Sequence, residues 1–237
     1  MADLYCLRLG ESMRNEFAER ARSAEEGKAL LVLPNTLLVD EVRQKNMLQA
    51  VNIDYLPNEI LRSNGLDELR LLSRQAQEVI VGRLLEKKRS AGALRYFANI
   101  SDARAFVKTM TNLIGELARA DVSATDLEEA LNAWSREGRE GCKDKEILDV
   151  CKEYEELLAL NNLYDMEGLY RLATKEASRA QSSIPWEELF FSDFYRFDRV
   201  QLELLKVLAK RCRVTVGIVG EPKKEKLYAA TLGTIGD

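Results

Sequence analysis

The segment after the first expected strand carries residue types that could bind phosphate. Residues 4–9 (LYCLRL) are expected to form a short strand, and Ser12 is expected to cap a helix that runs to Arg22. A glycine between a strand and a helix N-terminus, here Gly10, lets backbone N–H groups approach phosphate oxygens. The segment therefore stands where a P-loop would lie, but without the full glycine turn the backbone cradle for phosphate would not form.

The side chains of the same segment argue against nucleotide binding. An active P-loop also needs a lysine that meets the β and γ phosphates and a hydroxyl group for magnesium. If Gly10 opens the motif, Glu16 takes the lysine position and Phe17 the hydroxyl position, and aligning Gly10 as the second glycine fails as well. A carboxylate in that place repels phosphate, and Arg14 restores only part of the lost charge. We expect poor ATP binding and no bound ATP or magnesium cofactor.

The composition excludes several other classes of protein. Of the 237 residues 46% are hydrophobic, which is typical of a folded chain, and the net charge of -4 means that any contact with nucleic acid needs a local patch. The chain has no histidine, which excludes Ser-His-Asp hydrolases and HExxH proteases. The four cysteines form no CxxC pair, so we expect reduced thiols and no metal site. Without a signal peptide or an apolar run that could span a bilayer, we expect a cytoplasmic protein with no membrane contact.

Strand and helix signals alternate at both ends of the chain. Strands are expected at residues 28–34, 51–55, 189–192 and 214–219, and helices at 37–48, 56–61 and 198–211, with Asp198 as a helix cap. Continuous apolar strands are typical of a parallel sheet that is covered on both faces. We predict an α/β domain built from residues 1–65 and 181–237.

Between these two segments the apolar spacing becomes helical. From residue 66 to residue 180 the apolar side chains recur every three or four positions, and Thr125 with Glu128 has the spacing of a capping box at a helix start. We predict an all-helical insertion over residues 66–180 that splits the α/β domain.

Four segments resemble the AddB/RexB family of helicase-nuclease subunits and, more distantly, UvrD-type helicases. Residues 29–36 (ALLVLPNT), followed by Asp40 and Glu41, are similar to helicase motif Ia and to the start of AddB proteins. Residues 163–169 (LYDMEGL) are similar to a DFDDLL-type segment. Residues 190–201 (FFSDFYRFDRVQ) resemble DEFQDTxxxQ and its AddB version DGFxxFTPxQ, and residues 219–224 (VGEPKK) resemble the VGDPKQ of motif III.

The resemblance implies a RecA-like, P-loop NTPase-like first domain whose nucleotide site is degenerate, with the insertion as its 1B-like second subdomain. It places Ser192 and Asp193 where active helicases carry the acidic pair that holds magnesium and orients water. It also places Lys224 where these helicases have a glutamine that senses the γ phosphate. The implied degenerate nucleotide site consists of Gly10, Ser12, Arg14, Glu16, Ser192, Asp193, Glu221 and Lys224. The alternative is that the strands are ordinary core strands and Asp193 is a loop carboxylate.

Two basic groups are candidates for DNA contact. Lys87, Lys88 and Arg89 lie close in sequence to residues 95–97 (RYF) in the insertion, and Lys223 with Lys226 forms a basic turn. Cations can bind DNA phosphates, and aromatic rings can stack on bases. The alternatives are a solvated face for the cations and a core position for Tyr96 and Phe97.

The resemblance implies a scaffold that does not hydrolyse ATP, that binds duplex DNA ends, and that pairs with an AddA/RexA-like helicase-nuclease subunit in double-strand-break repair and recombination. The chain is then an amino-terminal fragment, and the iron-sulfur cluster of the family lies in a nuclease domain further along. Two alternatives remain: an active UvrD-like ATP-dependent helicase, and a helical module that binds proteins.

Overall fold

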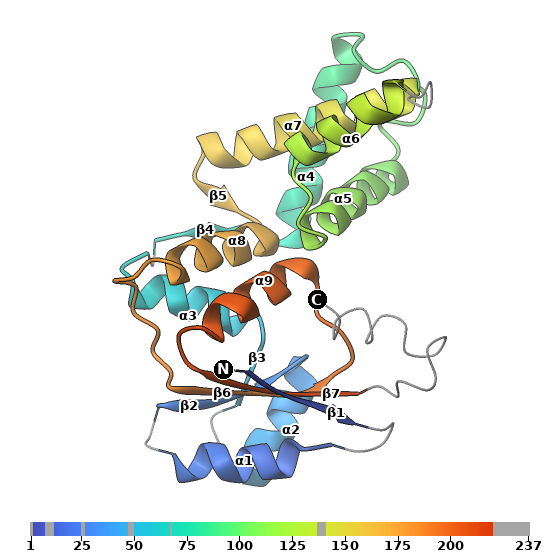
Figure 1. Ribbon diagram of the computed structural model, residues 1–237. Helices are drawn as coiled ribbons and strands as arrows, with labels where there is room; N and C mark the ends of the chain where they lie inside the picture. The colour runs from blue at the N-terminus through green and yellow to red at the C-terminus, as the bar shows by residue number, and fades with distance from the viewer. Residues whose placement is uncertain are drawn as a thin grey trace. The chain divides into compact units, whose positions relative to one another are not determined.

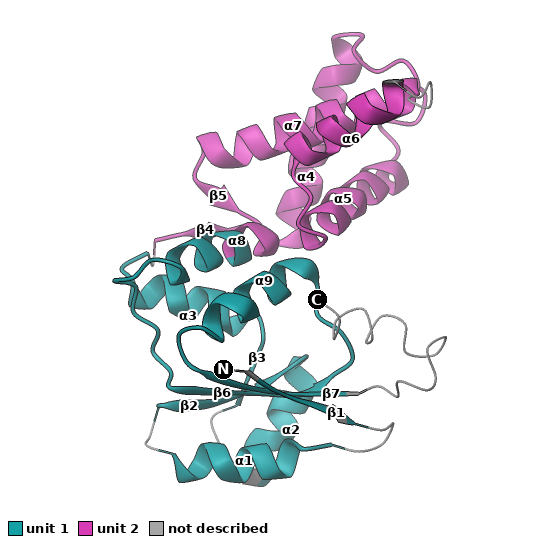
Figure 2. Ribbon diagram, viewed as in Figure 1, with its two compact units in different colours: residues 1–67, 170–237 teal, residues 68–169 magenta. Residues whose placement is uncertain are grey.

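The structure is a computed structural model that describes residues 2–7, 12–24, 27–46, 50–66, 68–136 and 141–219. Contacts divide the chain into unit 1, residues 1–67 with 170–237, and unit 2, residues 68–169 (Figure 2). The second junction lies inside helix α8 (Met166–Ala177), earlier in the chain than the sequence pattern placed it.

Unit 1 is built on a five-stranded parallel sheet in the order β1-β7-β6-β2-β3. Its strands are β1 (Ala2–Leu7), β2 (Ala29–Leu33), β3 (Ala50–Asn52), β6 (Glu188–Phe194) and β7 (Arg213–Val219). Strands from opposite ends of the chain lie side by side, since β1 pairs with β7 over its whole length and β2 pairs with β6 (Figure 1). The predicted parallel α/β sheet is confirmed.

Helices cover both faces of this sheet. Figure 1 shows α1 (Arg14–Ser23) and α2 (Thr36–Asn46) on one face, and α3 (Tyr55–Ser63) and α9 (Arg199–Leu208) on the other. Phe17 of α1 packs on Phe190 of β6 with ring centroids 5.4 Å apart. Because both faces are covered, Leu31, Val32 and Leu33 of β2 are fully buried. This explains why the strands read as continuous apolar runs.

The carboxyl ends of β2 and β6 lie side by side at the point in the sheet where the connecting helices change from one face to the other (Figure 1). From β1 the chain passes through α1, β2 and α2 to β3, and it later returns through β6 and α9 to β7. The neighbours β2 and β6 are therefore followed by helices on opposite faces of the sheet. Open α/β sheets bind ligands at the carboxyl ends of their strands beside such a switch point.

The predicted ends of β3 and α9 can be compared with the structure. The strand expected at 51–55 ends at Asn52, because Tyr55 already begins α3. Asp198 is the N-cap of α9, as expected, and its backbone N–H donates to Gln201 Oε1 at 3.0 Å. Among the described helices, none is both long enough and apolar enough to cross a membrane.

Unit 2 consists mainly of helices packed around one core. The helices are α4 (Arg74–Ser90), α5 (Arg104–Arg119), α6 (Ala124–Arg136) and α7 (Cys142–Leu160). Their buried side chains include Leu85, Met110 and Tyr154. The unit also contains a parallel pair of short strands, β4 (Arg70–Leu71) with β5 (Leu163–Tyr164), which is too short for a pattern of period two to reveal.

Candidate functional site

The candidate site lies at the carboxyl edge of the sheet, where an ion pair joins the first helix to the end of β6. Arg14, the first residue of α1, donates from Nε to Asp193 Oδ2 at 2.8 Å and from Nη2 to Asp193 Oδ1 at 3.1 Å. This two-point contact between a guanidinium and a carboxylate is among the strongest hydrogen-bonded pairs in proteins. Both groups are largely buried, with 21% of the Arg14 side chain and 14% of the Asp193 side chain exposed.

Asp193 owes its direction to an irregularity in β6. The pairing of β6 with β7 shifts register between Phe191 and Phe194, and Asp193 has a φ angle of 64°. A bulge of this kind re-aims a side chain, and a non-glycine residue in the left-handed region costs about 1–3 kcal/mol. The surrounding contacts of the carboxylate offset this local strain. Phe191, Phe194 and Phe197 pack against one another on either side of the bulge.

The electrostatics of the pair keep both groups charged. Burial by itself would raise the pKa of Asp193, but the hydrogen bonds and charge of Arg14, with smaller contributions from the hydroxyls of Ser192 and Ser12, lower this pKa below its ordinary value. The hydrogen bond to Asp193 is the main cause of the raised pKa of Arg14. At neutral pH the site therefore holds a full positive and a full negative charge that neutralise each other.

A second carboxylate, on α2, extends the network. Arg14 Nη1 donates to Glu41 Oε2 at 3.1 Å, and Lys45 Nζ lies 2.6 Å from Glu41 Oε1. Beside these residues is a hollow of about 200 Å³, which is lined by Ser12, Arg14, Asn15, Glu41, Val42 and Lys45. The guanidinium of Arg14 thus lies between two carboxylates and has little capacity left for a further anion.

The arrangement leaves the Asp193 carboxylate little capacity for a metal ion. Two nitrogens of Arg14 occupy one lone-pair direction on each oxygen, and the Ser192 hydroxyl donates to Oδ2 at 3.0 Å. A divalent cation would also meet the positive charge of Arg14 at close range. In the part of the chain that the structure describes, no three acidic or cysteine side chains gather as a metal site.

The structure brings together only some of the residues that the sequence singled out. Ser12, Arg14, Ser192 and Asp193 form one site, and the Ser12 hydroxyl accepts from the Arg14 backbone N–H at 3.1 Å. Glu16 lies exposed in the first turn of α1. Gly10, Glu221 and Lys224, together with Lys223 and Lys226, lie outside the described residues. The sequence analysis did not assign Glu41 to this site. Its position directly after the motif Ia-like segment could have indicated it.

The basic residues at the end of α4 are engaged with carboxylates. Lys87 and Lys88 both pair with Glu153 of α7, the latter at 2.9 Å, and Arg89 pairs with Asp102. Only 14% of the Lys88 side chain is exposed, against 72% for Lys87. Of the three, Lys88 is therefore the least available to an external phosphate.

A basic groove between α4 and α5 was not predicted. It has a volume of about 480 Å³ and is lined by Arg74, Gln75, Glu78, Arg104, Ala105 and Lys108. Arg104 and Lys108 are one helical turn apart on α5, exposed, and their side chains have no ion-pair partner among the described residues. Their i, i+4 spacing was the signal in the sequence, because it places both cations on one face of a helix.

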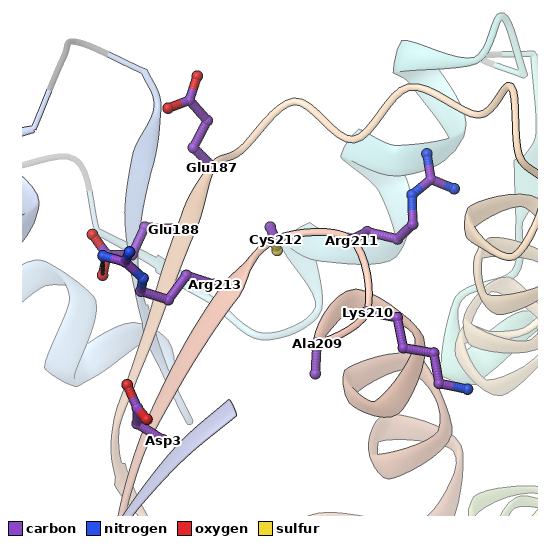
Figure 3. Close-up of a pocket in the computed structure, with 8 residues that line it drawn as sticks. All are labelled: Asp3, Glu187, Glu188, Ala209, Lys210, Arg211, Cys212 and Arg213. Atoms are coloured by element: carbon purple, nitrogen blue, oxygen red, sulfur yellow. Dashed lines mark ion pairs between the residues drawn. The ribbon is translucent and has the colours of Figure 1, made fainter. Parts of the chain in front are cut away.

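A hollow larger than the two described above lies elsewhere, at the amino-terminal edge of the same sheet. Figure 3 shows its lining of Asp3, Glu187, Glu188, Ala209, Lys210, Arg211, Cys212 and Arg213, with a volume of about 650 Å³. Glu188 pairs with Arg213 and Arg20, and Arg211 donates to the carbonyls of Ala177, Arg179 and Ser182. Glu188 and Arg211 therefore make structural contacts within the protein. The position is also opposite to the edge where such sheets bind ligands.

Fold and site together define a class of protein: an α/β protein of the RecA-like type, with a five-stranded parallel sheet that is interrupted by a mainly helical unit. The family described as "ADDB, N-terminal" matches residues 14–232, which is most of the chain, and the protein belongs to this family. A comparison with curated proteins found no match.

Proposed function

We propose that this protein is the amino-terminal part of an AddB-type DNA-repair subunit, in which the RecA-like unit is a scaffold that does not hydrolyse ATP. Membership of the ADDB N-terminal family supports the assignment to DNA repair. The expected partners are an AddA/RexA-like helicase-nuclease subunit and duplex DNA ends. The motor activity of the complex then resides in the partner subunit.

The observation that carries the loss of hydrolysis is the Arg14–Asp193 pair. A P-loop enzyme needs its acidic residue free for magnesium and its helix N-terminus open to phosphate. Here the acidic residue at the end of β6 is held at two points by the first residue of α1. Magnesium-bound nucleotide would have to break this largely buried ion pair. Each charge would then lose its partner, which costs several kcal/mol.

Titration of the full chain with a fluorescent ATP analogue, with and without magnesium, tests this part of the proposal. The expected result is no saturable, magnesium-dependent signal, while the AddA-type partner subunit saturates in the same assay. Saturation by the full chain alone would instead favour an active UvrD-like helicase.

The groove between α4 and α5 supports DNA contact by unit 2. Arg104 and Lys108 are exposed cations without an ion-pair partner among the described residues, and Arg74 adds a third charge to the same groove. The phosphate backbone binds such cations without regard to sequence, and each contact increases the salt dependence of the affinity. The paired cations Lys87 and Arg89 are second candidates, since their ion pairs are partly exposed.

Salt-dependent binding of the full chain to a labelled duplex end, measured by fluorescence anisotropy, tests the DNA contact. Replacing both Arg104 and Lys108 by Glu is expected to weaken binding at all sequences and to reduce the slope of log K against log salt by about two. Lys152→Glu on α7, which reverses a cation that is paired with Glu128 outside the groove, is the charge-reversal control. Binding that is insensitive to salt and to both variants would favour the helical unit as a protein-binding module.

A further inference from the structure

The loop between α4 and α5, residues 91–103, has no regular structure but is firmly anchored. The carboxylate of Glu146 on α7 accepts three successive backbone N–H groups, from Arg95 at 2.6 Å, Tyr96 at 2.7 Å and Phe97 at 3.0 Å. Successive N–H groups that converge on one anion form a nest, and hydrogen bonds to a charged acceptor are about twice as strong as neutral ones. The Glu146 side chain is buried, with 5% of its surface exposed.

The charge of Glu146 persists in this buried position. Burial alone would raise its pKa, but the N–H groups of Tyr96, Arg95 and Phe97 outweigh this effect, so that the pKa is lowered. The carboxylate is ionised at neutral pH and fixes the backbone on which residues 95–97 stand. The loop is thus preorganised before it meets any ligand.

The anchored backbone holds two adjacent aromatic residues in different environments. Phe97 packs on Phe106 of α5 with ring centroids 4.9 Å apart, and it supports Tyr96 edge-on, also at 4.9 Å. Tyr96 itself is 61% exposed. An aromatic ring that is fixed from below and open to solvent on its outer side is suited to stacking on a planar group.

The charge beside Tyr96 favours an anionic partner over an apolar or basic surface. Arg95 is exposed, and its side chain has no ion-pair partner within the described ranges. Three carboxylates of unit 2 are already paired: Glu146 with backbone N–H groups, Glu153 with two lysines, and Asp102 with Arg89. An unpaired arginine beside an exposed aromatic ring matches a nucleic-acid strand, in which phosphates and bases alternate.

We infer that Tyr96 is a base-stacking residue, on which unit 2 receives an unpaired base at a DNA end while Arg95 contacts the neighbouring phosphate. This inference rests on the proposed DNA binding and adds the chemical form of the ligand, a single-stranded or frayed end. Glu146 is a positioning residue, because it acts only through the backbone of residues 95–97.

The test uses the full chain and a duplex with a short single-stranded overhang that carries 2-aminopurine, whose fluorescence is quenched by stacking. Wild-type protein is expected to quench the probe. Tyr96→Ala is expected to abolish the quenching and to weaken binding to the overhang by about tenfold to a hundredfold, whereas Tyr96→Phe keeps both. Trp134→Ala, which removes another exposed aromatic residue of unit 2, is the matched control and is expected to leave both unchanged.

The outcomes separate this inference from the proposed function. If the wild type binds the duplex end but Tyr96→Ala retains quenching and affinity, stacking by Tyr96 is refuted and DNA binding stands. If Tyr96→Ala instead weakens only the association with the AddA-type subunit, the loop is a protein contact. If the wild type binds no DNA at all, both proposals fall.

Discussion

Arg14 and Asp193 are separated by 179 positions in the chain, yet the guanidinium of one contacts both carboxylate oxygens of the other. The contact joins the first helix to the carboxyl end of β6, the edge where a RecA-like sheet would hold nucleotide and magnesium. It depends on the bulge that turns Asp193 away from the regular strand direction. In this protein the contact at that edge links two elements of the fold.

Removal of Arg14 is expected to destabilise the protein on the order of 3 kcal/mol, because it leaves a largely buried carboxylate without its cation. Arg14→Lys is expected to cost less, but it cannot reproduce the two-point contact. Urea unfolding measures both variants. Arg20→Ala is the comparison on the same helix: its pair with Glu188 is more exposed, and its guanidinium lies over the ring of Phe190, so a smaller loss of about 1–2 kcal/mol is expected. Equal losses for Arg14→Ala and Arg20→Ala would contradict a special role for the Asp193 pair.

The stability of the protein should depend on Asp193 in an acid-sensitive way. Its pKa is lowered in the folded state, whereas an unfolded-chain aspartate titrates near about 4. The contribution is therefore complete above the unfolded-state pKa and is lost as the pH falls through the folded-state pKa. Unfolding free energies of wild type and Asp193→Asn should differ by a constant amount near neutral pH and converge in acid. A difference that stays constant down to the acid limb would show that Asp193 is not the titrating group.

The anchor of residues 95–97 can be measured by hydrogen exchange. Glu146→Gln replaces one acceptor oxygen by an NH₂ group that cannot accept from backbone N–H, so the amides of Arg95, Tyr96 and Phe97 should exchange at least about tenfold faster. Asp149→Asn, an exposed change on the same helix, should leave these rates unchanged. Unchanged protection in Glu146→Gln would mean that other contacts hold the loop.

Thr215, in β7, is expected to be better replaced by valine. Its hydroxyl is fully buried and has no hydrogen-bond partner among the described residues. Burying an unsatisfied hydroxyl is costly, so Thr215→Val should stabilise the protein by about 1 kcal/mol in urea unfolding. Thr111→Val is the matched control, because that buried hydroxyl donates to the Val107 carbonyl at 2.8 Å and its loss should destabilise. Destabilisation by Thr215→Val would point to a buried water at this hydroxyl.

The parallel sheet could be predicted from the sequence because its strands are buried on both faces. Residues 29–33 and 189–191 are apolar runs for this reason, and helical periodicity indicated the helices between them. Helix starts were harder to place. The capping box predicted at Thr125 and Glu128 lies two residues too late in the chain. Ser123 and Asp126 form it instead, since each side chain accepts from the other's backbone N–H, and α6 begins at Ala124. Two candidate pairs with the same spacing compete here, and only tertiary packing decides between them.

The sequence singled out some of the residues that meet at the candidate site, but it did not predict their contacts. The segment after the first strand pointed to Arg14, and the family-like segment 190–201 pointed to Ser192 and Asp193. That Arg14 contacts Asp193 at two points depends on a bulge and a positive φ, which no spacing rule encodes. The positions of Tyr96 and Phe97 could not be read from a pattern either, because Glu146, the buried carboxylate that accepts both backbone N–H groups, is distant in sequence.

The most direct test of the central claim is the ¹³C chemical shift of the Asp193 carboxyl group, followed by NMR in the full chain and assigned with Asp193→Asn. With Arg14 bound at both oxygens, the carboxylate should stay ionised below the pH at which ordinary aspartates titrate. Its resonance should not respond to magnesium with ATP or broaden with manganese. An ordinary titration, or broadening by manganese that ATP enhances, would show an open metal site and contradict the account.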